Sequence, residues 1–300
     1  MSRKLVVGAF TPSVLLRVAR RIGRLDETGL DVDEVPVASS PGQLRSLLDG
    51  DLDVVFTSPD NVVAYRFCAD NPLGVTADVK IVAAIDRGLG LGLYARNGTT
   101  ADQLRGAPWG VDVPTSGFAF VMYAAAESIG LSLDDYELTT LGSTPKRLAA
   151  LLDGRCAATM LNAGNELLAE EAGCTALVGA AEVCAPYLGT VLAIAGADNL
   201  QPAQQLAAVL RETTEQICSG LLDDVTAEEA TTALGLGPAL AEQYVARLKD
   251  PVEGLVRDAV VDRDALKTVI ELRRRYRPTI VDGVDVLAAA LDRESGLVVG

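Results

Sequence analysis

The chain has no histidine among its 300 residues. Nucleophilic catalysis with an imidazole base and metal sites built on imidazole are therefore excluded. The five cysteines are scattered and never stand at CxxC spacing; they are Cys68, Cys156, Cys174, Cys184 and Cys218. This pattern predicts idle or buried thiols in a reducing compartment, not a zinc site or a disulfide framework. We expect the protein to use neither a metal nor a cofactor.

Hydroxyl, amide and acidic side chains recur in six short loops, each after an apolar segment of strand length. When a helix follows, such a loop presents side-chain oxygens and backbone N–H groups at the positive end of that helix. Each loop alone can be a helix cap, but six together favour a polar binding cleft with aromatic neighbours. The candidate ligand-binding residues are Phe10, Thr11, Ser13, Ser39, Ser40, Thr57, Ser58, Asp60, Asn61, Tyr94, Asp112, Thr115, Ser116, Gly117, Ser143, Thr144 and Asn162.

The segments that must position these loops occur twice. Residues 41–50 (PGQLRSLLDG) and 145–154 (PKRLAALLDG) share six identities at an offset of 104 positions. Shorter matches upstream, such as Gly29 with Gly130, extend the likeness at nearly the same offset. We interpret the chain as two halves of about 100 residues with one plan, produced by duplication.

Within each half, strand-length apolar segments alternate with helical ones. We expect strands near 5–10, 32–37, 54–56, 109–113, 136–141 and 157–161. This alternation predicts an α/β fold in which each half is a mostly parallel sheet flanked by helices. Beyond about residue 200 the pattern predicts helices at 206–222, 227–234, 238–248, 263–276 and 284–291, which pack on the first half. The run Arg273, Arg274 and Arg275 is expected on a solvated helix face.

Charge and hydropathy limit the partners. Acidic residues outnumber basic ones by 41 to 26, giving a formal net charge of −15, so we expect no nucleic-acid partner. No segment approaches the ~18 apolar residues of a membrane-spanning helix. The apolar run 5–10 is too short for a signal peptide, and no cysteine near the start could carry a lipid. As written, the chain is expected to be cytoplasmic, and periplasmic or extracellular only if it is trimmed from a longer one.

Several segments resemble a known family: 23–30 (GRLDETGL), 43–50, 53–54, 57–60 (TSPD), 110–111 and 116–117. They are similar to the substrate-binding proteins of ABC transporters for nitrate, sulfonate, taurine and thiamine precursors. The resemblance implies a two-lobed periplasmic-binding-protein-like fold of type II, with crossovers near residues 85–96 and 186–197. Lobe I would comprise residues 1–90 and 192–300, lobe II residues 91–191, and the ligand would lie in the cleft between them.

Two functions on this fold remain open. The preferred one is a binding protein that closes its lobes around a small organic anion or a heteroaromatic ligand, with a membrane permease as partner if the protein is exported. The alternative is a cytoplasmic lyase or decarboxylase acting on a small carboxylate, with Asp60, Asp112, Tyr94 or a thiol as its acid–base group. A sensor that signals lobe closure is a third, weaker interpretation. The histidine-consuming thiamine-pyrimidine synthases on this fold are excluded, because the chain has no histidine.

Overall fold

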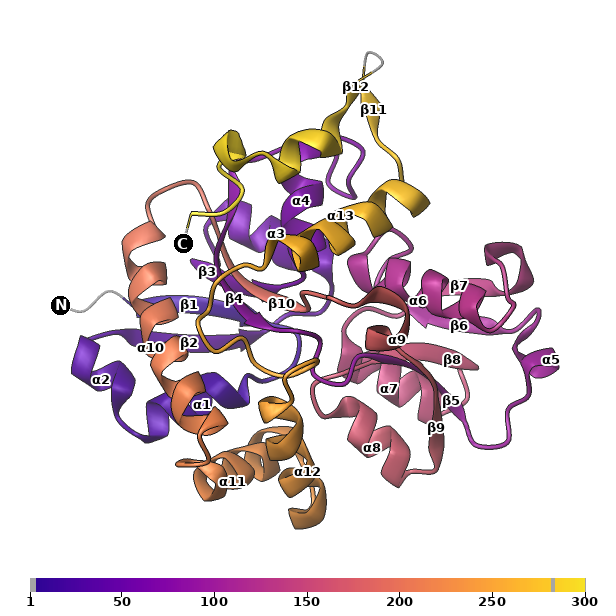
Figure 1. Ribbon diagram of the computed structural model, residues 1–300, viewed down its shortest axis with the longest axis horizontal. Helices are drawn as coiled ribbons and strands as arrows, with labels where there is room; N and C mark the ends of the chain where they lie inside the picture. Colours follow the sequence, from indigo (N-terminus) through magenta and orange to yellow (C-terminus); the bar gives the residue numbers. More distant parts are fainter. Residues whose placement is uncertain (1–3, 282–283, 300) are drawn as a thin grey trace.

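The structure is a computed structural model that describes residues 4–281 and 284–299. Its main elements form two α/β lobes, each built on a five-stranded sheet (Figure 1). In lobe I the strands are ordered β2 (Asp31–Pro36), β1 (Lys4–Ala9), β3 (Val54–Thr57), β10 (Thr190–Ala195) and β4 (Val79–Asp86). In lobe II they are ordered β7 (Glu137–Thr140), β6 (Pro108–Val111), β8 (Ala158–Leu161), β5 (Gly92–Arg96) and β9 (Cys174–Gly179).

Both sheets have the same pattern of strand directions. In lobe I, β1 pairs in parallel with β2 and β3, whereas β10 is antiparallel to both β3 and β4. In lobe II, β6 pairs in parallel with β7 and β8, whereas β5 is antiparallel to both β8 and β9. Four strands of each sheet therefore run one way and a single strand runs the other way. This arrangement confirms the predicted fold class of two mostly parallel sheets.

The single reversed strand of each sheet is the one that the chain enters from the other lobe. The chain leaves β4 of lobe I and enters β5 of lobe II through residues 87–91. It returns from β9 to β10 through residues 180–189. The first crossing has positive φ angles at Gly88 (123°), Leu89 (50°) and Gly90 (75°), a backbone that glycine adopts without a Cβ clash. Two short crossings thus join the lobes.

The two matched sequence segments occupy equivalent places in the two lobes. The first forms most of α3 (Ser40–Asp49), and the second forms most of α7 (Thr144–Leu152). Helix α3 connects β2 to β3, and α7 connects β7 to β8, so each links the edge strand of its sheet to the strand in the middle of that sheet. Gly50 and Gly154, which end the matched segments, both have left-handed φ angles, 82° and 74°. The sequence repeat therefore corresponds to a repeat in three dimensions.

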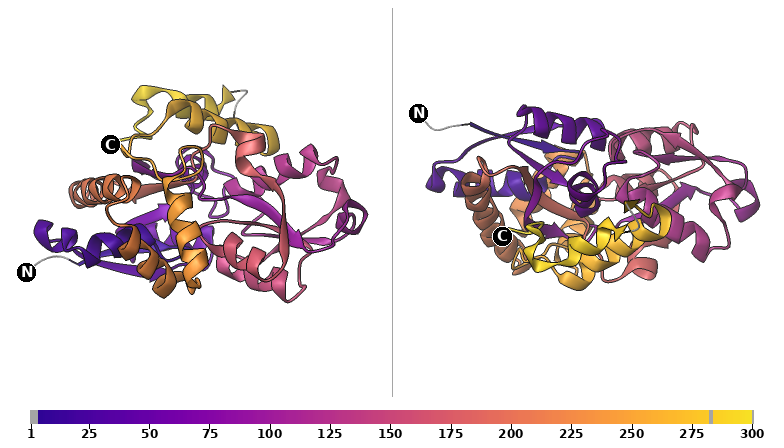
Figure 2. Two further views of the ribbon diagram at one scale, coloured as in Figure 1. Left: turned by 60° about the horizontal axis from the view of Figure 1, so that its bottom comes forward. Right: turned by 90° about the horizontal axis from the view of Figure 1, so that it is seen from above.

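The remaining helices cover the two sheets and connect the lobes. They are α1 (Val14–Arg21), α2 (Arg24–Thr28), α4 (Pro59–Phe67), α5 (Ala101–Leu104), α6 (Gly117–Ser128), α8 (Asn165–Glu171), α9 (Ala180–Cys184), α10 (Leu200–Cys218), α11 (Asp223–Leu234), α12 (Pro238–Lys249) and α13 (Arg263–Tyr276). Helices α10 and α11 pack on α1 of lobe I, whereas α13 contacts both α4 of lobe I and α6 of lobe II (Figures 1 and 2). Within the described part of the chain, no helix has the length and apolar character needed to cross a bilayer.

The prediction of a last α-helix at 284–291 is wrong. Val284–Asp285 forms β12, which pairs with β11 (Ile280–Val281), and Val286–Leu291 forms a short 3₁₀ helix. The carboxylate of Asp285 accepts a hydrogen bond from the backbone N–H of Leu287. Asp285 therefore caps a helix that begins at the next residue, and the chain before it stays extended. A further short 3₁₀ helix, Arg293–Ser295, follows before the end of the described chain.

Trp109 anchors the core of lobe II. Its side chain is fully buried and stacks on Tyr136, with 4.0 Å between ring centroids. The indole N–H donates to the carbonyl of Leu104 at 3.2 Å. The stacked pair joins two segments of the lobe that are 27 positions apart in sequence.

Replacing Trp109 with alanine is expected to lower the free energy of unfolding by about 3–5 kcal/mol, because it leaves a large cavity in a packed core. Leu221→Ala is the matched control: Leu221 is 76% exposed, so its loss should change stability by less than ~0.5 kcal/mol. Urea unfolding followed by far-ultraviolet circular dichroism measures both. Equal losses in the two variants would show that Trp109 is not a core anchor.

Candidate ligand-binding cavity

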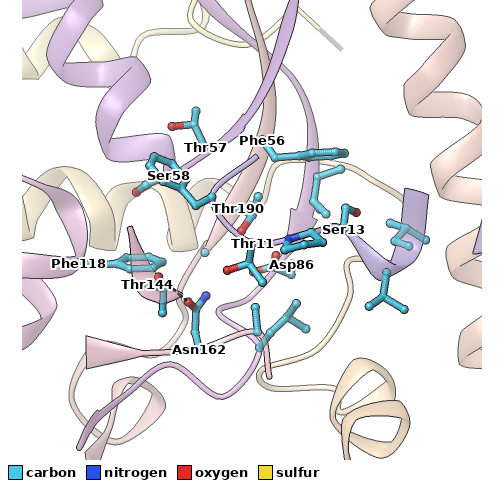
Figure 3. A pocket seen from close by; sticks show the side chains of 18 of the residues that line it. Thr11, Ser13, Phe56, Thr57, Ser58, Asp86, Phe118, Thr144, Asn162 and Thr190 are labelled. Carbon is cyan, nitrogen blue, oxygen red and sulfur yellow. Dashed lines mark hydrogen bonds between the residues drawn. The ribbon is translucent and has the colours of Figure 1, made fainter. Parts of the chain in front are cut away.

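A cavity of about 130 Å³ lies between the two lobes. Its wall includes residues that follow the carboxyl ends of strands in both sheets, where ligands bind in open α/β sheets. Phe10 follows β1, Asp112 follows β6 and Asn162 follows β8. Figure 3 shows Phe118, Thr144 and Asn162 on one side of the cavity, with Thr11, Ser13 and Asp86 on the other. The cavity is therefore built from both lobes.

The structure brings eleven of the predicted site residues into the wall of this cavity. They are Phe10, Thr11, Ser13, Thr57, Ser58, Asn61, Asp112, Ser116, Gly117, Thr144 and Asn162. The other six, Ser39, Ser40, Asp60, Tyr94, Thr115 and Ser143, are not among the lining residues. Whether any of the eleven contacts a ligand stays a prediction.

Three serines of the wall cap the helices that begin there. The hydroxyl of Ser13 accepts from the N–H of Leu16 at 3.2 Å, at the start of α1. Ser58 caps α4 and Ser116 caps α6 in the same way, each at 3.3 Å. As acceptors in these bonds, the hydroxyls keep their own hydrogens for another group in the cavity. Each of these loops can therefore cap a helix and contact a ligand at the same time.

Arg147 of α7 is a cavity residue that the sequence analysis missed. It is 3% exposed and donates to the carbonyls of Gly142 and Met160 and to the hydroxyl of Thr144. Burial lowers its pKa to about 10, and the nearby charge of Asp112 opposes that shift. Gln43 stands at the matching position of α3 and bonds the carbonyls of Gly8 and Phe56 in the same manner. The sequence repeat could have indicated this role, because Arg147 is a charged residue at the position that matches Gln43 in the first half.

Asp86 is the second polar residue that was missed. It ends β4, is 3% exposed and accepts from the N–H of Gly88 at 2.8 Å and from Thr190. Burial raises the pKa of this carboxyl to about 6. Gly189 packs so closely here that an added Cβ would lie 2.5 Å from a carboxylate oxygen of Asp86. The sequence could have indicated Asp86, because this acidic residue ends an apolar segment just before a glycine-rich one.

The rest of the wall is apolar. The rings of Phe10, Phe56 and Phe118 are joined by aliphatic and aromatic side chains from α1, β4, the first crossing and the C-terminal region. These are Val14, Leu15, Ile85, Leu89, Tyr244, Leu248 and Leu255. Tyr244 and Leu248 belong to α12, so the C-terminal helices contribute directly to the site. The cavity therefore suits a small molecule with an apolar body and a polar group.

Several of the predicted polar loops contact the opposite lobe instead of the cavity. The backbone N–H of Ser40 donates to the Asp112 carboxylate at 3.0 Å, and that of Ser143 donates to the carbonyl of Ala38 at 3.0 Å. Ser39 caps α3 through the N–H of Gly42. Tyr94 lies elsewhere in lobe II, where its hydroxyl donates to Glu170 at 3.0 Å. The bonds of Ser40 with Asp112 and of Ser143 with Ala38 therefore hold the lobes together around the cavity.

Asp60 and Arg273 form a buried ion pair within lobe I, beside lobe II, and the prediction of a solvated face for Arg273 is wrong. The Nε and Nη2 atoms of Arg273 lie 2.6 and 2.8 Å from the two oxygens of Asp60. Nη2 also donates to the carbonyl of Thr115 in lobe II at 3.0 Å. Asp60 is fully buried, and Arg273 is 3% exposed because α13 lies between α4 and α6. This fork geometry engages both oxygens of Asp60.

The fold and the enclosed cavity together define a class: the chain has the two-lobed periplasmic-binding-protein fold. Comparison with protein-family models and with curated proteins gave no match. Among solved structures, the chain is similar to the alkanesulfonate-binding protein SsuA from Xanthomonas axonopodis pv. citri bound to MOPS (TM-score 0.73, 16% identity, 96% of this chain and 98% of that one covered).

Two further structures show the same likeness. The periplasmic aliphatic sulphonate binding protein SsuA from Escherichia coli has a TM-score of 0.66 at 16% identity, covering 92% of this chain and 86% of its own. A conserved Candida albicans gene product with the generic periplasmic binding protein fold has a TM-score of 0.71 at 15% identity, covering 99% and 96%. The resemblance drawn from the sequence is thus confirmed at the level of the fold.

Gly142 is expected to be required for lobe closure. Gly142 and Gly130 both have a φ of 81°, so alanine strains the backbone alike at both, by about 1 kcal/mol. Only at Gly142 would the new Cβ meet the other lobe, 2.5 Å from the carbonyl of Ala38; Gly130 has nothing within 4 Å. Small-angle scattering should show a larger radius of gyration for Gly142→Ala and no change for Gly130→Ala. An unchanged radius in both variants would contradict this role.

Asp86 is expected to make stability depend on pH. Its pKa rises from 3.8 to about 6 on folding, so its contribution is fully present below pH 4 and is lost as the pH rises through 6. Asp86→Asn removes this loss. Between pH 4 and pH 7 the variant should therefore gain on the order of 3 kcal/mol of unfolding free energy relative to the wild type. Urea titrations at the two pH values measure this, with the exposed Asp134→Asn as control; a difference independent of pH would refute it.

Proposed function

We propose that this protein binds a small organic molecule by closing its two lobes around it. The observation that carries the proposal is the cavity of about 130 Å³ between the lobes, with polar groups from helix starts and an apolar remainder. Lobe I is proposed to comprise residues 1–90 and 192–300, and lobe II residues 91–191. Opening would then be a rotation about the crossings at 87–91 and 180–189.

The similar structures support a binding role. Two of them are sulfonate-binding SsuA proteins, and one of these was solved with MOPS bound. Another is the ligand binding component of an ABC-type import system from Staphylococcus aureus. By analogy with that import system, a membrane permease is the proposed protein partner if the chain is exported. The cytoplasmic location expected from the sequence stays a prediction.

The arrangement of the acid–base candidates favours binding over catalysis. Asp60 is engaged by Arg273, Tyr94 donates to Glu170, and neither residue lines the cavity. The thiols lie outside the cavity wall as well, and burial raises the pKa of Cys156 and Cys184 to about 11. A thiol with so high a pKa is a poor nucleophile at neutral pH. Of the acid–base groups suggested for a lyase, Asp112 alone lies in the wall described here.

A thermal-shift screen tests the proposal. The panel holds alkyl and aryl sulfonates, carboxylates, amines, amidines and nitrogen heterocycles, and a tight ligand should raise the melting temperature by mass action. Mass spectrometry after incubation separates the two functions, because a binding protein returns its ligand unchanged. A panel without any shift argues against a ligand cavity, and a turned-over hit favours the enzyme.

Phe118 provides the mutational test. Phe118→Ala removes an aromatic ring from the cavity wall. Because the ligand would lose an apolar contact with that ring, the affinity for any screened ligand should fall by about tenfold or more. Phe67→Ala is the matched control, since Phe67 is also half-buried but lies outside the cavity. Isothermal titration calorimetry measures both. Equal affinities in the two variants would place the ligand elsewhere.

A further inference from the structure

Resting on the proposed function, we infer that the ligand is a small, largely apolar nitrogen compound, such as an amine, an amidine or an amino-substituted heterocycle, and not an organic anion. The inference comes from the charged and polar groups in the cavity wall. Three charged side chains stand among the described lining residues: the carboxyls of Asp86 and Asp112, and the guanidinium of Arg147. Their hydrogen bonds show which of them has capacity left for a ligand.

Asp112 retains one carboxylate oxygen that can accept a hydrogen bond from a ligand. Its residue is 8% exposed, and its Oδ2 accepts from the N–H of Ser40 at 3.0 Å. Its Oδ1 is buried and accepts no hydrogen bond from any described group. A buried carboxylate oxygen without a donor is costly, and an N–H group supplied by a ligand would remove that cost. A protonated nitrogen would do so most strongly, because both partners would carry charge.

Arg147 has little hydrogen-bonding capacity left for an anionic ligand. Among the described lining residues it is the single cationic side chain, and its guanidinium makes four hydrogen bonds to protein oxygens. These oxygens belong to Gly142, Thr144 and Met160 of its own lobe. Its charge also interacts with that of Asp112. Four of the five N–H hydrogens of this guanidinium are therefore committed to the protein, and one on Nη1 is left for an anionic ligand.

The other carboxyl of the wall does not favour an anion either. At the helix starts, Ser13, Ser58 and Ser116 each accept from one helical N–H and keep a hydroxyl hydrogen that suits a neutral acceptor as well as an anionic one. Asp86 adds a second buried carboxyl that an anion would have to approach. With both carboxyls ionised, the three charged side chains leave the cavity net negative. A neutral or cationic ligand avoids that repulsion.

The apolar part of the wall indicates the character of the rest of the ligand, beyond its nitrogen group. Phe10, Phe56 and Phe118 provide aromatic faces, and Leu89 and Leu255 provide aliphatic ones. Such a wall accommodates a ring or a short hydrocarbon body. An aromatic amine or amidine thus matches both the apolar wall and the acceptor of Asp112.

Benzamidine and benzoate form the probe pair for the test, because they have nearly the same shape and opposite charge; benzenesulfonate extends the anionic set. We expect benzamidine to bind the wild-type protein at least tenfold more tightly than either anion by calorimetry. Asp112→Asn keeps the size of the side chain and an oxygen for the N–H of Ser40. It should weaken benzamidine binding at least tenfold, whereas the exposed Asp134→Asn should not. Melting temperatures report whether both variants are folded.

The outcomes separate this inference from the proposed function. Tighter binding of benzoate or benzenesulfonate, or a preference for benzamidine that survives Asp112→Asn, overturns the inference and leaves a ligand-binding protein. The same holds if the screen yields an anion whose affinity Asp112→Asn leaves unchanged or raises. If neither the probes nor any compound of the screen binds, the proposed function itself fails, and the inference with it.

Discussion

The direction of one strand in each sheet determines where the site can form. The strands β4 and β9 run toward the cleft, so each crossing leaves its lobe there and enters the other lobe at the cleft. The strands that receive the chain, β5 and β10, must then run away from the cleft, antiparallel to their neighbours. Both connections consequently lie beside the cavity, and the carboxyl ends of the other strands face one another across it. Polar loops at those ends are a consequence of this topology, and so is the place of the proposed hinge beside them.

The closed arrangement depends on a few buried polar contacts between the lobes. Asp60 is neutralised by Arg273, which also reaches the carbonyl of Thr115 across the cleft. Losing either partner of such a pair leaves an unpaired charge in a low-dielectric interior, which costs several kcal/mol. The backbone of Ser40 and the carboxylate of Asp112 form a second contact of this kind. The hydrogen bonds of Arg273 with Thr115 and of Ser40 with Asp112 form only when the lobes meet, so opening would hydrate these groups. The proposed ligand would shift the balance by the contacts that it adds in the closed state.

The sequence predicted much of the fold and part of the site. The alternation of strands and helices is local, so the segments near β1, β3, β6 and β8 were found from apolar periodicity alone. The C-terminal helices α10 to α13 were also found, although α10 begins at Leu200 and not at 206. The strands β4, β5 and β9 were not predicted, because their direction and their pairing partners depend on segments that are distant in sequence. Arg273 was misplaced for the same reason: its partner Asp60 is 213 positions away.

By itself, the sequence determined that this protein works without imidazole and that hydroxyl-bearing loops precede its helices. Capping is a local interaction between a side chain and the next few backbone N–H groups, so Ser13, Ser58 and Ser116 could be recognised from their neighbours. Only the tertiary structure decided which loops line the cavity and which contact the other lobe. It also decided that Arg147 and Asp86 belong to the wall. Burial and charge pairing arise from segments distant in sequence, and their energies exist only after those segments have met.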